Sequence, residues 1–120
     1  MKQLFLVFLG GGIGSALRYL ISKSLNNELP YGTFIVNILG CLIIGFLLTI
    51  ASKNNHISQN QLLLIATGFC GGFTTFSTFA FENSQFLKQG DFLNFFLYSI
   101  ISFSIGIASI FGGIWLAKLI

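Results

Sequence analysis

Four long apolar runs make up most of the chain, and short polar stretches separate them. The runs cover residues 4–25, 31–52, 61–87 and 92–120. Each run is long enough to cross a hydrocarbon core, which needs about 20 helical residues. The polar connections, of which the longest reads SKNNHISQNQ, are too short to form a separate domain. The pattern predicts an all-α integral membrane protein whose four transmembrane helices form one domain over residues 1–120.

The composition agrees with a membrane protein. Of the 120 residues, 54% are hydrophobic and 8% are charged, and the mean hydropathy is +0.87. Soluble globular domains carry about 25% charged residues. The chain starts like a secretory signal peptide, with Lys2 before an apolar run, but no small-x-small cleavage site follows and Arg18 lies within the run. We therefore expect this segment to be retained as the first span.

The cationic residues divide almost evenly between the two sides of the membrane that four spans define. Because an excess of Lys and Arg in the loops sets the orientation, a near balance predicts insertion in both directions and an antiparallel homodimer. The isoelectric point near 9.1 does not indicate nucleic-acid binding, because the cations are spread singly and form no basic patch. One side has Lys2, Lys53 and Lys118, and the other has Lys23 and Lys88, with Arg18 if its side chain reaches the interface.

The residues that usually carry metal or covalent chemistry are few. Cys41 and Cys70 both fall within apolar runs, which predicts buried packing residues rather than a disulfide or a zinc site. The lone His56 lies in a polar connection without a second ligand type nearby, so we expect it to be solvated. The spans hold no constellation of His, Asp, Ser and Cys, which argues against an intramembrane enzyme.

Glycines mark two expected helix contacts and one break. Gly10 and Gly14, and Gly68 and Gly72, are small-xxx-small pairs that let helix backbones approach closely. In the stretch GFCGGFTTFSTF, residues 68–79, the adjacent Gly71 and Gly72 each cost about 1 kcal/mol relative to alanine in a helix. We expect the third helix to break there, near the midplane. Freed carbonyls would favour a cation, and the restarted helix N-terminus would favour an anion.

Polar and aromatic side chains near the break have two possible roles. Asn37, deep in the second span, either bonds another helix or lines a pore. Phe76 and Phe79 are three residues apart and project from one side of the restarted helix. They either pack or present electropositive ring edges to an anion.

Two hydroxyl stripes extend from this region. In the third span, Thr75, Thr78 and Glu82 recur at spacings of three and four, so they share a helical face. In the fourth span, Tyr98 and Ser102 also lie on one face. The stripes indicate a wet path, although hydroxyls can also bond to backbone carbonyls four residues back.

Three segments together resemble the signature blocks of the fluoride channel family called Fluc or CrcB: GGGIGSALRY, YGTFIVNILGCLIIG and GFCGGFTTFSTFAFE. The resemblance covers the whole chain in length, number of segments and order of motifs. It implies a dual-topology antiparallel homodimer in the plasma (inner) membrane, with two pores that export fluoride passively from the cytoplasm. It also implies a structural sodium ion at the twofold centre.

The resemblance implies roles for individual residues. The backbone carbonyls of Gly71 and Thr74 would bind the sodium ion, and Phe76, Phe79 and Asn37 would line the pore. Arg18 would mark the aqueous vestibule. Gly106 departs from the family pattern, because a hydroxyl is often found at its position. The remaining members of the expected polar track are Ser77, Thr78 and Glu82 on the third helix and Tyr98 and Ser102 on the fourth.

Two other classes of membrane protein remain open. A small multidrug-type proton-coupled exporter is also a four-helix, dual-topology dimer of about this length, and its required deep carboxylate would be Glu82. A non-transporting assembly or scaffold protein would conduct no ion at all.

Overall fold

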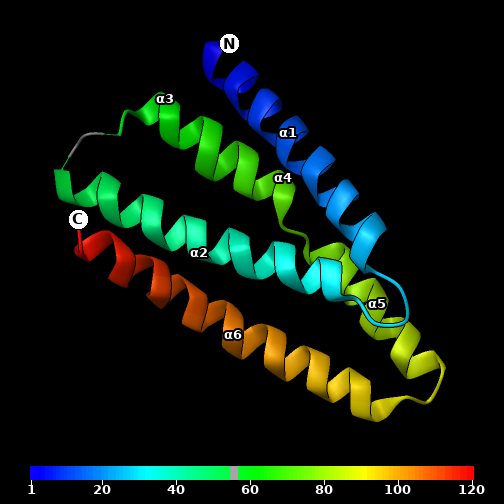
Figure 1. Cartoon of the computed structure of the whole chain (residues 1–120). Coiled ribbons are helices and arrows are strands. Elements are labelled where there is room, and N and C mark those ends of the chain that lie inside the picture. Colours follow the sequence, from blue (N-terminus) through cyan, green and yellow to red (C-terminus); the bar gives the residue numbers. More distant parts are fainter. Residues whose placement is uncertain (55–56) are drawn as a thin grey trace.

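The computed structural model describes residues 1–54 and 57–120, and within them the chain is helical (Figure 1). Four helical spans are long and apolar enough to cross a membrane, as the sequence predicts. Three of them are α1 (Lys2–Leu25), α2 (Tyr31–Asn54) and α6 (Phe92–Lys118). The remaining span, third in the chain, consists of α3 (Gln59–Leu62), the π-helix η1 (Leu63–Cys70), α4 (Gly71–Phe73) and α5 (Phe76–Lys88).

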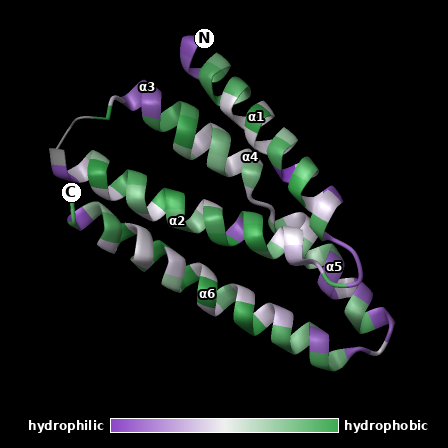
Figure 2. Ribbon diagram, viewed as in Figure 1, coloured by the Kyte–Doolittle hydropathy of each residue, from purple (hydrophilic) through white to green (hydrophobic). Residues whose placement is uncertain are grey.

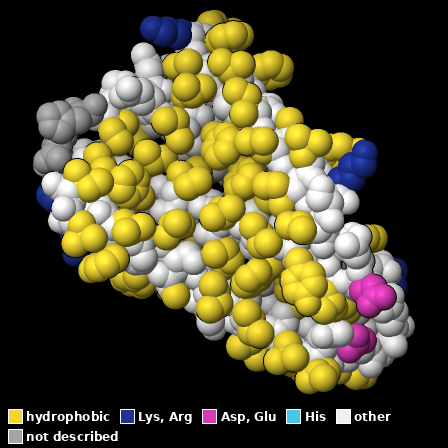
Figure 3. Space-filling model, viewed as in Figure 1, with side chains coloured by type: hydrophobic (Ala, Val, Ile, Leu, Met, Phe, Trp, Pro, Cys, Tyr) yellow, Lys and Arg dark blue, Asp and Glu magenta, His cyan; other side chains and the backbone are white. Residues whose placement is uncertain are grey.

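The surface is that of a multi-pass membrane protein. Hydrophobic residues predominate along the spans, and hydrophilic residues gather mostly at the helix ends and connections (Figure 2). The space-filling view shows a largely hydrophobic face, with Lys and Arg at its margins (Figure 3). Large apolar side chains such as Phe8 and Phe103 are exposed in the isolated chain. Lipid, rather than water, is the solvent that suits such a surface.

The glycine pairs pack α1 against η1 and α4, and this contact confirms their predicted role. A Cβ atom at Gly14 would overlap the carbonyl oxygen of Phe69, and one at Gly72 would overlap that of Gly11. Gly10 and Gly68 face this same interface. Because the backbones touch directly, dispersion contacts replace the hydrophobic effect, which is absent between helices in lipid.

A second close contact, which the sequence did not predict, joins α2 to α6. The two helices run side by side in opposite directions (Figure 1). A Cβ atom at Gly45 would overlap the carbonyl oxygen of Ile110, and one at Gly113 would overlap that of Leu42. The molecule therefore consists of two glycine-packed pairs of elements.

The chain is flat rather than a closed bundle. Its principal extents are 49 × 32 × 20 Å, and 20 Å is about two helix diameters. Among the described residues, few apolar side chains are fully buried; Cys70 is one of them, which agrees with its predicted packing role. Cys41 is partly exposed and free, and His56 lies outside the described residues. Such a thin molecule encloses little interior.

Candidate functional site

The third span breaks at Thr74 and Thr75, whose backbones are extended (φ −86°, ψ 159° and φ −151°, ψ 122°). The predicted break is thus present in residues 68–79, but its placement at Gly71 and Gly72 is wrong, because both glycines belong to helix α4. The threonines provide the physical reason. Thr75 is the N-cap of α5, and its Oγ1 accepts a hydrogen bond from the backbone N–H of Thr78 at 3.1 Å.

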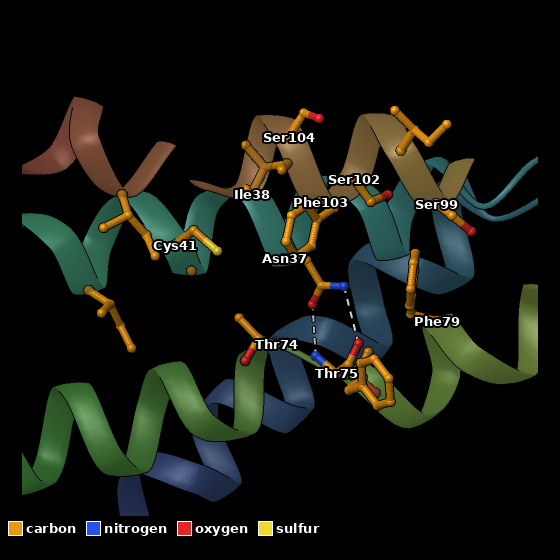
Figure 4. Close-up of a pocket in the computed structure, with 16 residues that line it drawn as sticks. Asn37, Ile38, Cys41, Thr74, Thr75, Phe79, Ser99, Ser102, Phe103 and Ser104 are labelled. Carbon is orange, nitrogen blue, oxygen red and sulfur yellow. Dashed lines mark hydrogen bonds between the residues drawn. The ribbon is translucent and has the colours of Figure 1, made fainter. Parts of the chain in front are cut away.

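Asn37 on α2 holds the break in place through two hydrogen bonds (Figure 4). Its Nδ2 donates to the Thr75 carbonyl oxygen at 3.1 Å, and its Oδ1 accepts from the Thr75 N–H at 2.8 Å. The Thr75 N–H can only donate, so the orientation of the amide follows from this pairing. Asn37 therefore joins two helices and also lines the adjacent groove, with one N–H of its amide unused by these bonds.

The break frees backbone carbonyls from their helical partners. In an uninterrupted helix Gly71 O would accept from the Thr75 N–H, which instead donates to Asn37. Thr74 O would accept from the Thr78 N–H, which instead donates to Thr75 Oγ1. Two carbonyls thus lack their helical donors beside an open surface, since no atom lies within 4 Å of a Cβ built on Gly71.

Arg18 on α1 satisfies a third carbonyl at the break. Its Nε donates to Gly72 O at 2.9 Å, and Ser15 Oγ donates to the same oxygen at 3.3 Å. The cation thus lies at the C-terminal end of α4, where the helix dipole favours positive charge. Arg18 therefore binds a backbone carbonyl next to the break, a contact that the sequence did not predict.

A groove of about 720 Å³ lies between α2, the break, the start of α5 and α6 (Figure 4). It brings together residues that are far apart in the sequence. Most of its wall is apolar, and the polar groups are the exceptions. The predicted site residues among its lining are Asn37, Thr74, Phe76, Phe79 and Ser102.

Phe76 and Phe79 line the groove, and Phe79 also contacts an aromatic ring of α6. Phe76 is 79% exposed in the isolated chain, and its ring centroid lies 6.0 Å from that of Phe79. Phe79 in turn lies 4.9 Å from the ring of Tyr98. The prediction that Phe76 and Phe79 project from one side of α5 agrees with this geometry, and the three rings form a row that leads away from the groove.

At the end of this row, three donors surround the Glu82 carboxylate. Tyr98 OH donates to Oε1 at 2.9 Å, Thr33 Oγ1 donates to Oε2 at 2.8 Å, and Asn26 Nδ2 lies 3.3 Å from Oε2. Sequence reasoning predicted Glu82 and Tyr98 but missed Thr33 and Asn26. Thr33 is four residues before Asn37, so the helical spacing of the second span contained a signal for it.

The other predicted track residues differ in their surroundings. The Oγ of Ser102 is buried and has no hydrogen-bond partner among the described residues. Ser77 is exposed, with its Oγ 3.4 Å from Thr75 Oγ1. Thr75 itself is a cap, so it does not share a helical face with Thr78 and Glu82 as the spacing predicted. Ser102 thus belongs to the lining of the groove, while its unpaired hydroxyl oxygen is enclosed by protein atoms.

Gly106 lies one turn beyond Ser102 on α6, where the motif resemblance led us to expect a hydroxyl. Gly106 and Cys41 both line the groove, and a Cβ built on Gly106 would meet the Cys41 Sγ at an ordinary contact distance of 3.7 Å. A thiol of α2 therefore faces the position just beyond the hydroxyl stripe of α6.

Comparison with known proteins agrees with the motif resemblance. A family model described as CrcB-like protein, Camphor Resistance (CrcB), matches residues 5–114. A protein of Phocaeicola vulgatus named fluoride-specific ion channel FluC is 48% identical, covering 98% of this chain and all of the relative. Proteins of the same name from Gloeothece citriformis and Flavobacterium psychrophilum are 50% and 43% identical, each covering 98% of both chains. The chain therefore belongs to the CrcB-like protein family.

Proposed function

We propose that this chain is a fluoride-specific ion channel that lets fluoride leave the cytoplasm passively across the plasma membrane. The observation that carries the proposal is its end-to-end likeness to bacterial proteins of that name. The groove agrees with it, because Asn37 and several hydroxyl-bearing residues, including Ser102, belong to a lining that is otherwise mostly apolar.

The lining suits a small, strongly hydrated anion. A selective pore must replace the water around such an ion with short-reach donors. The unused N–H of Asn37, the hydroxyl of Ser102 and the ring edges of Phe76 and Phe79 are donors of this kind. Lysines occur only near the ends of the spans, so no ammonium group would hold fluoride too tightly to release it.

A second, antiparallel copy of the chain would cover the groove and complete two pores. The flat shape, the exposed ring of Phe76 and the near balance of cations across the membrane support this arrangement. Adding several lysines between residues 53 and 60 should trap one orientation. Fluoride efflux should then disappear and should return when an oppositely biased copy is co-expressed. Full activity from a single trapped orientation would refute the antiparallel dimer.

The two carbonyls freed at the break fit a sodium ion between the copies. Gly71 O and Thr74 O lose their helical donors, and the space above Gly71 is open. Two neutral oxygens from each chain suit a hard cation. When bound, the ion would compensate these oxygens and hold the two breaks together. Purification in lithium or a large organic cation in place of sodium should lower dimer stability and efflux, and unchanged values of both would contradict this assignment.

The exporter alternative is not favoured. Its proton and cation site would be Glu82, whose two oxygens are already engaged by three donors.

The relatives are named as channels, which agrees with the expectation that the chain is not an enzyme.

The test is ion efflux from proteoliposomes, with fluoride and chloride compared in the same preparation. We expect rapid fluoride efflux and chloride efflux no faster than from protein-free vesicles. Exchange of an organic cation for protons that is lost in Glu82→Gln would instead support the exporter. No ion movement from correctly assembled protein would support a scaffold.

A further inference from the structure

Asn26 lies in the connection between α1 and α2, and its side chain joins this connection to the Glu82 carboxylate. Its Oδ1 accepts hydrogen bonds from the backbone N–H groups of Gly32 at 2.7 Å and Thr33 at 3.1 Å. Its Nδ2 donates to Thr33 Oγ1 at 3.0 Å and to Glu82 Oε2 at 3.3 Å. The two amide hydrogens and the two oxygen lone pairs are all used, and the backbone donors identify which end of the amide is oxygen.

In every hydrogen bond at Glu82, the carboxylate is the acceptor. Thr33 Oγ1 accepts from Asn26, which leaves the hydroxyl hydrogen of Thr33 to donate to Glu82 at 2.8 Å. Tyr98 donates to the other carboxylate oxygen. Thr33 is 0% exposed, so its hydroxyl depends on partners within the protein. The Nδ2 group of Asn26 thus fixes the direction in which the Thr33 hydroxyl donates.

We infer that Asn26 is a positioning residue for the ion pathway, because it fixes the place of the Glu82 carboxylate and the direction of the Thr33 hydroxyl. The inference rests on the proposed fluoride channel, in which Glu82 and Tyr98 belong to the polar track. Fluoride that passes these groups competes with Glu82 for the hydroxyl hydrogens of Thr33 and Tyr98. The donors around Glu82 therefore set how readily those hydrogens turn to the ion.

The variant Asn26→Asp separates this role from a purely structural one. Aspartate keeps an oxygen for the N–H groups of Gly32 and Thr33, and it caps helices as well as asparagine does. It removes the Nδ2 donor and places a second carboxylate beside Glu82. We expect fluoride efflux from folded protein about tenfold below that of the unaltered protein, since a hydrogen bond to a charged group is lost. The unfolding midpoint should fall for the same reason but stay above the assay temperature.

Asn27→Asp is the matched control. Asn27 is exposed beside Asn26, so the variant adds the same charge to the same connection away from Glu82. We expect it to conduct like the unaltered protein. Unchanged efflux in Asn26→Asp, an equal loss in Asn27→Asp, or a loss of efflux that follows a loss of folded protein would each overturn the inference.

Glu82→Gln, alone and combined with Asn26→Asp, tests whether Asn26 acts through Glu82. If it does, the double variant should conduct at the rate of Glu82→Gln alone, because the carboxylate to be positioned is already gone. Losses that multiply would overturn the inference. Absence of fluoride efflux from the unaltered protein would contradict the channel function itself. Unfolding midpoints of the same variants would then decide on Asn26: non-additive shifts support its coupling to Glu82, and additive shifts overturn it.

Discussion

The two halves of the third span differ in what their side chains contact. Before the break, η1 and α4 place Gly68, Cys70 and Phe73 in buried positions. After the break, α5 turns Phe76 into the open groove and Glu82 into a cluster of hydroxyl and amide donors. One transmembrane segment therefore serves as scaffold in its first half and as candidate pathway in its second, and the break is the boundary between them.

The boundary itself should be the most sensitive position. Asn37→Leu keeps much of the side-chain volume but leaves the Thr75 N–H and carbonyl without the partners that they have now. Each buried unpaired group costs about 1–3 kcal/mol, so we expect a large fall in the unfolding midpoint and loss of efflux. Ile38→Leu, at the neighbouring position of the groove wall, should leave both unchanged. A stable Asn37→Leu protein would show that the break holds its shape without this contact.

The scaffold half should respond to added volume. A Cβ atom at Gly14 would overlap the Phe69 carbonyl oxygen, whereas one at Gly12 has no atom within 4 Å. Overpacking costs about 1–3 kcal/mol, so Gly14→Ala should lower the unfolding midpoint, and efflux should fall only in proportion to the folded protein lost. Gly12→Ala should be neutral or slightly stabilising. Equal midpoints for the two variants would refute the close contact between α1 and η1.

The pathway half should respond in efflux rather than in stability. Phe76→Ile fills much of the same space but lacks the electropositive ring edge, so we expect fluoride efflux to fall by about tenfold or more at an unchanged midpoint. Phe76→Met should be milder, because the thioether is polarizable and adaptable. Phe8→Ile is the control, since Phe8 on α1 is 76% exposed and Phe76 is 79% exposed. Equal efflux from the Phe8 and Phe76 variants would contradict a specific role for Phe76.

Gly106→Ser should have the smallest effect. The Cβ would meet Cys41 Sγ at an ordinary contact distance of 3.7 Å, and serine is a better helix former than glycine by a few tenths of a kcal/mol. We expect a slightly higher unfolding midpoint and efflux at or slightly above the rate of the unaltered protein. A strong loss of efflux would indicate that the open position at Gly106 is needed for the ion.

The sequence predicted the features that depend on local pattern and not those that depend on pairing. The spans, the α1 glycine contact and the shared side of Phe76 and Phe79 all follow from hydropathy and helical spacing. The placement of the break did not, because the geometry at Thr75 depends on Asn37, which is distant in the sequence. Asn26 was missed for the same reason, since an asparagine in a polar connection has no local feature that points to Glu82.

Fluoride efflux from the double variant Phe76→Ile, Phe79→Ile decides whether α5 carries the pathway while η1 and α4 carry the fold. Its unfolding midpoint is measured on the same sample. We predict the midpoint of the unaltered protein together with efflux close to that of protein-free vesicles. A stable double variant that conducts at the rate of the unaltered protein would show that neither ring lines the pathway and that α5 does not carry it.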